Sequence, residues 1–281
     1  MDRISGTTRV AAVIGDPVRH SLSPVIHNAA FAATGLDWVY LALPVVDGEA
    51  EGALAGMRSF GFDGLSVTMP HKSAVAALVD SLSPAAAALE AVNCVVRDGS
   101  RLHGENTDGP GFLDALVEES GYDPAGSSCV VMGAGGAARA VIVALAEAGA
   151  DSVVVLNRSA VAAEGAASLA GSRGRTGVAD DIGAADLVVQ ATPLGMTGHL
   201  SSVAPFDFTL LRPDQLIAEL IYQPAMTPLR QHCERNGMAH VGGVGMLIHQ
   251  AAHAFTLWTG LDAPVPAMRA AAMTELASRS E

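Results

Sequence analysis

Short apolar runs rich in β-branched residues alternate with alanine-rich stretches along the whole chain. The short runs have the length and composition of buried strands, and the stretches between them have those of helices. Alternation of this kind is typical of βαβ units, in which helices join parallel strands. The pattern predicts an α/β protein with strands at residues 10–14, 39–44, 64–68, 93–97, 128–133, 152–156, 187–191, 215–221 and 239–242.

Two features of the pattern indicate a division into domains. A helix expected over residues 108–121 leads into a strand that ends in a glycine-rich turn, as a separate nucleotide-binding unit would begin. The segment 245–278 is expected to form two helices, separated by Gly260 and Pro264, with no strand between them. We therefore expect an N-terminal α/β domain with a mainly parallel sheet (residues 1–107), completed by C-terminal helices (243–281), and a Rossmann-like domain over 108–242.

Charge and composition exclude several classes of protein. The chain has 16 basic and 29 acidic residues, a net charge of −13, and no basic run of the kind that binding to nucleic acid or an anionic membrane requires. The N-terminus lacks a signal-peptide pattern, and no apolar run reaches the length of a membrane span. Three cysteines without a Cys-x-x-Cys pair indicate reduced thiols, with Cys129 in the core. We expect a cytoplasmic protein.

A glycine motif between an apolar strand and an alanine-rich helix indicates a dinucleotide site. Residues 133–138 read Gly-Ala-Gly-Gly-Ala-Ala, a Gly-x-Gly-x-x-Ala pattern. Gly133 suits the tight turn, and Gly135 lets the backbone approach a pyrophosphate. Ala138 allows close packing of helix on sheet, with the helix N-terminus facing the anion.

The residues after the next strand distinguish between nicotinamide cofactors. An acidic residue usually stands there when the cofactor is NAD, but this chain has Asn157-Arg158-Ser159. An arginine cannot accept a hydrogen bond from the ribose 2′-hydroxyl, whereas it can pair with a 2′-phosphate. Arg158 therefore favours NADP, although a solvated surface arginine is the alternative.

Polar residues at strand ends in the first half of the chain are candidates for chemistry. Ser21 and Ser23 precede a helix whose N-cap we expect to be Ser23, and two hydroxyls there suit either capping or a carboxylate. Thr68 and Lys72 follow a strand, at the edge where open α/β sheets bind ligands. Asp108 stands just ahead of a helical run, where an aspartate can also be an N-cap.

The histidines do not indicate a metal site. They are scattered, and no His-Glu-x-x-His pattern occurs. His249 and His253 lie one turn apart on an apolar helix, but without a third ligand we interpret them as helix packing.

Together, the motifs closely resemble those of the shikimate dehydrogenase family. The resemblance spans nearly the whole chain, in order and at compatible spacing. It rests on Gly-x-Pro-Val-x-His-Ser-x-Ser-Pro at 15–24, Ser-Val-Thr-x-Pro-x-Lys at 66–72, Ala-Val-Asn at 91–93, Asn-Thr-Asp at 106–108, Gly-Ala-Gly-Gly-Ala at 133–137, Asn157-Arg158, Ala-Thr-Pro-Leu-Gly-Met at 191–196, Tyr-x-Pro at 222–224 and Gly-Met-Leu-x-x-Gln at 245–250.

The resemblance implies reversible, NADPH-dependent reduction of 3-dehydroshikimate to shikimate, in the pathway to chorismate and the aromatic amino acids, in a cleft between the domains. It implies Lys72 as the acid/base residue, with Asp108 orienting substrate and lysine. Ser21 and Ser23 would hold the carboxylate, and Thr68, Asn93, Asp108, Gln250 and Tyr222 would surround the ring. Residues implied to bind NADP are Gly133, Ala134, Gly135, Gly136, Ala137, Asn157, Arg158, Ser159, Thr192, Leu220, Gly243 and Met246. No metal, nucleic acid or membrane partner is expected; the chain would be a monomer or a homodimer.

Departures from the family pattern leave substrate and cofactor preference open. Ala160-Val161-Ala162 stands where NADP-using members often carry a second basic residue, Cys94 replaces a frequent threonine, Glu219 replaces an aspartate, and Gly242 replaces an acidic residue. One alternative is a quinate or quinate/shikimate dehydrogenase with relaxed use of NAD and NADP. A more remote one is a non-catalytic sensor of NADP or a metabolite, which would be expected to lack the Lys72 and Asp108 pair.

Overall fold

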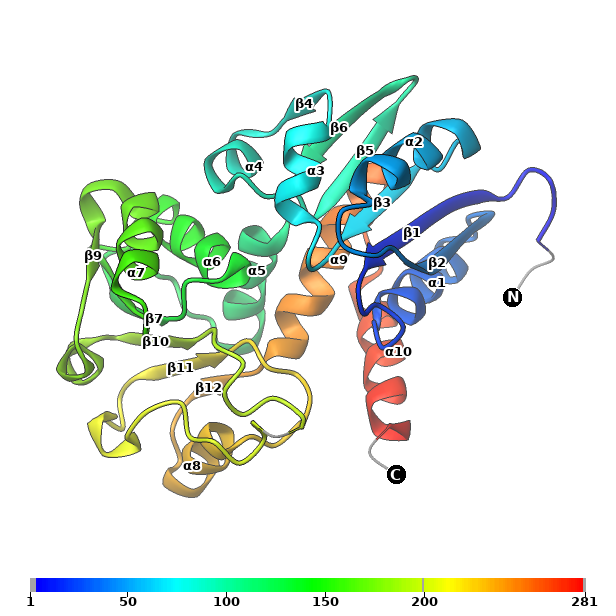
Figure 1. Cartoon of the computed structure of the whole chain (residues 1–281). Helices are drawn as coiled ribbons and strands as arrows, with labels where there is room; N and C mark the ends of the chain where they lie inside the picture. Colours follow the sequence, from blue (N-terminus) through cyan, green and yellow to red (C-terminus); the bar gives the residue numbers. More distant parts are fainter. Residues whose placement is uncertain (1–3, 199, 280–281) are drawn as a thin grey trace. The chain divides into compact units, whose positions relative to one another are not determined.

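The computed structural model describes residues 4–198 and 200–279 and divides into two units (Figure 1). The first unit runs up to Thr107 and resumes at Ile248; the second is Asp108–Leu247. Each unit has its own six-stranded sheet, so the predicted α/β fold is confirmed. Among the described residues, no helix is both long and apolar enough for a membrane crossing, and no group of three His, Cys, Asp or Glu side chains is placed to hold a metal.

The sheet of the first unit is mixed, in the order β2-β1-β3-β5-β6-β4. Strands β1 and β2, β1 and β3, and β4 and β6 pair in parallel, whereas β5 is antiparallel to both β3 and β6. The strands are β1 (Arg9–Gly15), β2 (Trp38–Pro44), β3 (Gly64–Val67), β4 (Ser81–Leu82), β5 (Cys94–Asp98) and β6 (Arg101–Glu105).

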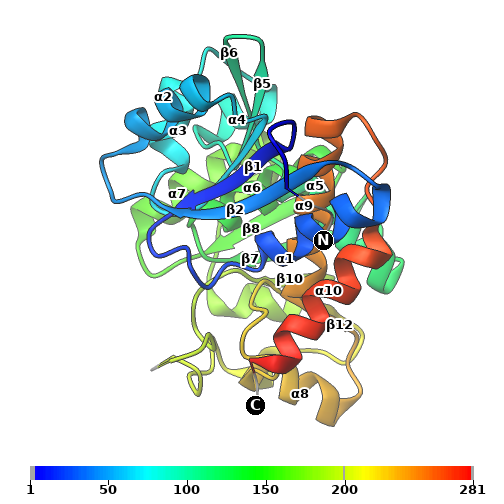
Figure 2. The ribbon, with the colours of Figure 1, turned by 90° about the vertical axis from the view of Figure 1, so that its right-hand side faces the viewer.

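Helices cover both faces of this sheet (Figure 2). On one face Ala12 and Ile14 of β1 pack with α2 and α3 in a buried apolar cluster. On the other face α1 and α10 lie side by side, and the indole of Trp258 in α9 packs against Gly64. The helices are α1 (Ser23–Thr34), α2 (Ala50–Phe60), α3 (Lys72–Leu78), α4 (Pro84–Leu89), α9 (Gly243–Thr259) and α10 (Val265–Ser278), the first five residues of α9 belonging to the second unit.

The sheet of the second unit is parallel throughout, in the order β12-β11-β10-β7-β8-β9. This is the doubly wound order of dinucleotide-binding folds, with the strand order reversing between β7 and β10. The strands are β7 (Ser128–Met132), β8 (Ser152–Leu156), β9 (Gly174–Thr176), β10 (Leu187–Gln190), β11 (Leu216–Glu219) and β12 (His240–Val241). The helices are α5 (Asp108–Ser120), α6 (Gly136–Glu147), α7 (Ala160–Ala167) and α8 (Pro228–Asn236), with 3₁₀ turns at Ser168–Arg173, Ala179–Ala184 and Phe208–Leu210.

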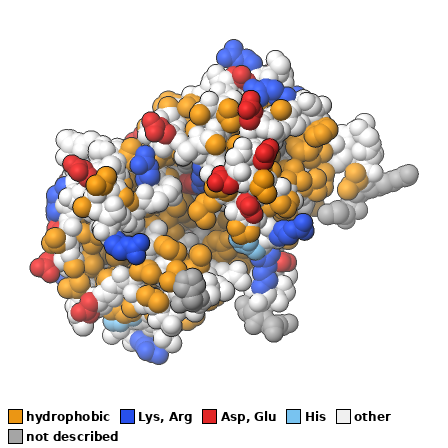
Figure 3. Space-filling view, viewed as in Figure 1, with side chains coloured by type: hydrophobic (Ala, Val, Ile, Leu, Met, Phe, Trp, Pro, Cys, Tyr) orange, Lys and Arg blue, Asp and Glu red, His pale blue; other side chains and the backbone are white. Residues whose placement is uncertain are grey.

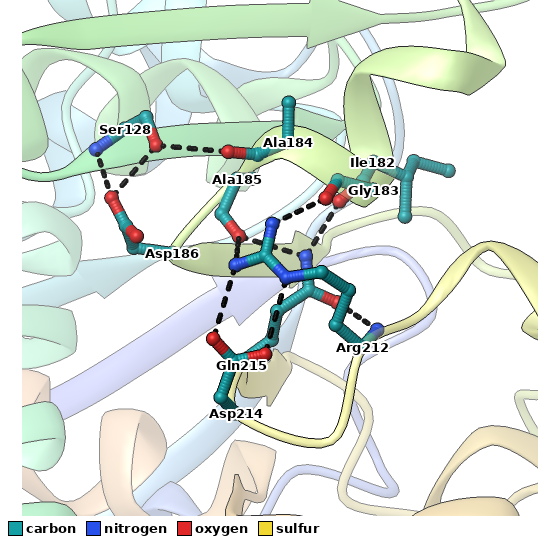
Figure 4. Close-up of polar contacts among 9 residues, drawn as sticks. All are labelled: Ser128, Ile182, Gly183, Ala184, Ala185, Asp186, Arg212, Asp214 and Gln215. Atoms are coloured by element: carbon teal, nitrogen blue, oxygen red, sulfur yellow. Dashed lines mark hydrogen bonds and ion pairs between the residues drawn. The ribbon is translucent and has the colours of Figure 1, made fainter.

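A polar network closes the amino ends of three strands in this sheet (Figure 4). The Gln215 side chain, 1% exposed, donates to the carbonyls of Ile182 and Ala185 and accepts from the Arg212 backbone. Asp186 accepts from both the backbone and the hydroxyl of Ser128. These contacts lie at the amino ends of the strands. Sheets of this type bind ligands at the opposite, carboxyl ends of their strands.

Candidate active site

In the first unit, strand register brings the predicted substrate residues to one edge of the sheet, the edge formed by the carboxyl ends of β1 and β3 and the start of β5. Ile14 at the end of β1 pairs with Val67 at the end of β3, and Ser66 pairs with Cys94 at the start of β5. The Thr68 backbone N–H donates to the Ile14 carbonyl at 3.0 Å. The loops after β1 and β3 and the residues ahead of β5 therefore meet at this edge.

The serine pair lies in the loop after β1, and the expectation that Ser23 is the N-cap of α1 was wrong. Leu22 occupies the N-cap position without a side-chain cap, and Ser23 is the first residue of the helix, 8% exposed. Its backbone N–H donates to Ser21 Oγ at 3.2 Å. Pro24, at the second helical position, needs no N–H partner, so this helix end does not require the Ser23 hydroxyl.

Lys72 is the half-buried first residue of α3. Its carbonyl accepts from the Val92 backbone at 3.0 Å, which fixes its backbone beside the approach to β5. The preceding residue, His71, is 1% exposed, and its Nε2 lies 2.7 Å from the Val45 carbonyl. The loop that carries Lys72 is therefore attached to the loop after β2 as well as to β1.

Asn93 and Thr107 form the centre of this edge. The Asn93 amide donates to Thr107 Oγ1 at 3.0 Å and accepts from the Thr107 backbone at 2.8 Å, and Asn93 is 4% exposed. Thr107 Oγ1 also donates to the carbonyl of Gln250 at 3.0 Å, which ties α9 to the same place. Asp108, 7% exposed, follows directly as the first residue of α5. Sequence reasoning missed Thr107, although it lies inside the Asn-Thr-Asp motif.

In the second unit, the glycine turn lies at the point where the strand order reverses. Gly133 has a φ of 115°, and a Cβ there would come within 3.0 Å of the Ala191 carbonyl at the end of β10. Gly135 is the N-cap of α6, is exposed, and has no atom within 4 Å of the position that a Cβ would occupy. The turn thus presents open backbone and a helix N-terminus, which fits the pyrophosphate of a dinucleotide.

The loop after β8 fits a phosphorylated ribose. Arg158 is exposed, and within residues 4–198 and 200–279 its guanidinium has no hydrogen-bond or ion-pair partner. The Asn157 side chain donates to the Ser159 carbonyl, and Ser159 Oγ caps α7 by accepting from Ala162. Arg158 therefore lies on a hydrogen-bonded turn ahead of α7, and its exposed guanidinium is accessible to a ligand.

Gln190, which sequence reasoning missed, fixes the loop after β10. It is fully buried, its Nε2 donates to the carbonyls of Thr192 and Leu194, and its Oε1 accepts from the backbone and hydroxyl of Thr192. The signal was available, because Gln190 is the one polar residue of an apolar strand immediately before the Ala-Thr-Pro motif.

The remaining predicted cofactor residues gather around the start of α9. A Cβ at Gly243 would collide with the Leu220 carbonyl, and Met246 and Leu220 pack in the same apolar cluster. Tyr222 is half-buried, two residues farther along from Leu220. Burial raises the pKa of the nearby Glu219, which accepts from the Thr227 hydroxyl at 2.5 Å. Glu219, which replaces the family aspartate, thus connects the end of β11 to Thr227 at the start of α8.

Charged side chains are spread over the face of the molecule that Figure 3 shows. On this face, arginines and acidic residues alternate with apolar and neutral side chains.

Comparison with known proteins assigns the chain to a family. A family model described as the shikimate dehydrogenase substrate binding domain matches residues 13–95, and one described as the shikimate 5′-dehydrogenase C-terminal domain matches residues 243–273. The shikimate dehydrogenase (NADP(+)) of Moorella thermoacetica is 45% identical over 278 residues, covering 95% of this chain and 94% of the relative. The chain belongs to the shikimate dehydrogenase family.

Two solved structures of similar proteins extend the likeness to the fold. The shikimate 5-dehydrogenase of Thermus thermophilus, solved in complex with NADP(H) and shikimate, is 37% identical with a TM-score of 0.88, covering 95% of this chain and 99% of that one. The quinate dehydrogenase of Corynebacterium glutamicum, solved in complex with NAD, is 32% identical with a TM-score of 0.87, covering 95% and 99%. Members with this architecture thus differ in substrate and cofactor, and local residues must decide between them.

Proposed function

We propose that this chain is an NADP-dependent shikimate dehydrogenase, which reversibly reduces 3-dehydroshikimate to shikimate on the route to chorismate and the aromatic amino acids. The observation that carries the proposal is the 45% identity to a shikimate dehydrogenase over 95% of the chain. The gathering of hydroxyl, amide and ammonium side chains at one sheet edge supports it.

The first unit would bind the substrate. We assign Ser21 and Ser23 to the carboxylate, because hydroxyl donors can hold an anion in an otherwise acidic protein and the N-cap of α1 does not use the Ser23 hydroxyl. Thr68, Asn93 and Gln250 would bond the ring hydroxyls, and Tyr222 would complete the pocket. The contacts of Asn93 with Thr107 hold its amide in one orientation for that purpose.

Lys72 would act as the acid/base residue. When bound, NADPH supplies a hydride to the substrate carbonyl carbon. Negative charge then develops on the carbonyl oxygen, and the Lys72 ammonium donates a proton to it; in the oxidative direction the amine takes the proton back. Asp108 would orient both lysine and substrate. An arginine could not replace Lys72, because a guanidinium stays protonated at any working pH.

The second unit would hold NADP. Gly133 to Ala137 would face the pyrophosphate, and the exposed guanidinium of Arg158 on the turn Asn157–Ser159 would pair with the 2′-phosphate. Thr192, fixed by Gln190, and the group Leu220, Gly243 and Met246 would border the nicotinamide.

We further propose a cytoplasmic location and a monomeric or dimeric enzyme. All three cysteines are free and buried, as suits a reducing compartment.

A quinate dehydrogenase that uses NAD is the second candidate, since a quinate dehydrogenase bound to NAD shares this fold. Initial rates with shikimate and quinate, each with NADP+ and with NAD+, distinguish the two. We expect the highest kcat/KM with shikimate and NADP+. A higher kcat/KM with quinate and NAD+ would overturn the proposal.

A further inference from the structure

The acid/base role proposed for Lys72 depends on how firmly the first turn of α3 is held. This helix has only seven residues, Lys72–Leu78, and a helix of that length is not stable in isolation. The Lys72 ammonium also stands at the end of a flexible four-carbon side chain, so a small shift of the backbone can move it out of reach of a substrate oxygen. The contacts that fix this turn therefore matter for proton transfer.

His71 is the buried residue of the turn. Residues 68–72 all lie within the described part of the chain, and of these only His71 is buried, with 1% of its surface exposed. Met69 and Pro70, which precede it, are exposed. Burying a polar ring costs free energy unless the ring is hydrogen-bonded. An apolar side chain would suit this position better if its only task were to fill space.

The His71 ring forms its hydrogen bond outside its own helix. His71 occupies the N-cap position of α3, yet its side chain makes no capping bond. Its Nε2 instead lies 2.7 Å from the carbonyl oxygen of Val45, in the loop between β2 and α2. A carbonyl can only accept, so Nε2 carries the hydrogen and donates it. The Val45 N–H in turn donates to the carbonyl of Gly15, the last residue of β1, at 3.2 Å.

The backbone of His71 connects this anchor to Lys72. The His71 N–H donates to the Thr68 carbonyl at 3.0 Å, and the His71 carbonyl accepts from the Val75 N–H at 2.9 Å, at the start of α3. That carbonyl belongs to the peptide group that joins His71 to Lys72. The ring bond and the two backbone bonds together fix the direction in which the chain enters Lys72.

We propose that His71 is a positioning residue for Lys72, holding the turn that carries the ammonium through its bond to the Val45 carbonyl. This role rests on the proposed function, in which Lys72 exchanges the proton. Without the bond the turn can shift away from the loop after β2, and a misplacement of about 1 Å can lower a rate by about 10²-fold. The backbone of Thr68 should keep its place, because its N–H is bonded independently to the Ile14 carbonyl.

The variant His71→Phe keeps a flat ring and removes the hydrogen bond. We expect kcat for shikimate oxidation by NADP+ to fall about tenfold, while the KM values for shikimate and NADP+ stay within about twofold. His71→Gln should restore kcat to within about threefold of wild type, because a glutamine amide nitrogen lies as far along the side chain as Nε2 and can donate to the same carbonyl. If His71→Phe does not fold, His71→Asn, whose amide is one bond shorter, replaces it and should be equally slow.

Trp258→Phe is the matched control. The Trp258 indole N–H is also a buried ring donor in the first unit, and it bonds the Val95 carbonyl at 3.1 Å. Removing this bond should lower the melting temperature, as removing the His71 bond should, yet leave kcat and both KM values within about twofold. The control thereby separates a loss of stability from a loss of position.

A double-mutant cycle with Lys72→Ala shows whether His71 acts through the lysine. In the Lys72→Ala background, His71→Phe should lower the residual rate no further. The positioning role would be overturned by a kcat of His71→Phe within about twofold of wild type, an equal fall in both backgrounds, no recovery in His71→Gln, or an equal fall in Trp258→Phe. Wild-type enzyme that failed to turn over shikimate would overturn the function itself, whereas normal wild-type turnover with an unaffected His71→Phe variant overturns only the role of His71.

Discussion

Lys72 is the only lysine in a chain whose other fifteen cationic side chains are arginines. It begins α3 at the sheet edge where Thr68 and Asn93 also lie. At a surface position either cation would serve, but proton exchange with an alkoxide needs a group that can lose its proton. The presence of lysine at this one position supports the acid/base role that we propose for it.

Replacing Lys72 with alanine should therefore lower kcat by about 10²- to 10⁴-fold, the usual contribution of a general acid. The KM for shikimate should change by less than about threefold, because we assign substrate binding to the hydroxyl and amide groups. Lys72→Arg, which keeps the charge but cannot release a proton, should not restore turnover. Steady-state rates and shikimate binding measured on both variants test this, and near-normal kcat in either one contradicts the assignment.

Arg158 gives a second prediction at the level of a single residue. Its guanidinium has no protein partner among the described residues, so Arg158→Ala should leave stability unchanged. The KM for NADP+ should rise about 10- to 100-fold, as expected for a lost charge-assisted contact, while the KM for NAD+ should not rise. The exposed Arg235 on α8 provides the control, since Arg235→Ala should alter neither value. Equal losses with both cofactors would show that Arg158 does not read the 2′-phosphate.

At the level of elements, the sequence predicted the long apolar strands well and the polar ones poorly. The β8 strand was predicted to the residue, because Val153, Val154 and Val155 form a continuous apolar run. The β6 strand was missed because Arg101 to Glu105 is largely polar. Its extended conformation is stabilised by antiparallel pairing with β5, which the apolar pattern does not indicate. The two-residue Gly99-Ser100 loop between them was an overlooked hairpin signal. The three-residue β9 and two-residue β4 likewise depend on neighbours that the sequence pattern does not reveal.

The site residues followed the same rule. Motif residues such as Ser21 and Lys72 could be proposed from the sequence because the resemblance assigns them by position. Thr107 was missed because its importance lies in a contact with Gln250, which is distant in sequence. Gln190 was missed although it stands as the one polar residue of an apolar strand next to the Ala-Thr-Pro motif that it holds in place. The N-cap prediction for Ser23 failed since Leu22, with helical backbone angles, already occupies that position.

The turn into α6 allows two matched glycine substitutions. Gly133→Ala places a side chain at a φ of 115° and against the Ala191 carbonyl, so it should cost about 1–3 kcal/mol and lower the melting temperature by several degrees. Gly135→Ala adds a methyl group where no protein atom lies within 4 Å. It should leave melting unchanged and weaken NADP+ binding at least tenfold. Thermal melts and NADP+ titrations of both variants test this; tight NADP+ binding by Gly135→Ala would contradict the pyrophosphate site.

At the scale of the whole molecule, we propose that the first unit binds the substrate and the second unit binds NADP. NADP+ added alone should slow amide hydrogen exchange at the end of β7, the start of α6 and the loop after β10. Shikimate added alone should slow exchange at the start of α1 and in the loop before α3. Exchange mass spectrometry on the full chain measures both patterns. Protection by NADP+ confined to the first unit would contradict the assignment of the cofactor to the parallel sheet.

The chemistry itself is tested most directly by supplying the full-length enzyme with NADPH and 3-dehydroshikimate and identifying the product by chromatography. We expect one shikimate to be formed for each NADPH oxidised, with NADH supporting a much lower kcat/KM. Absence of NADPH oxidation, or oxidation that yields a product other than shikimate, would contradict the function proposed for this chain.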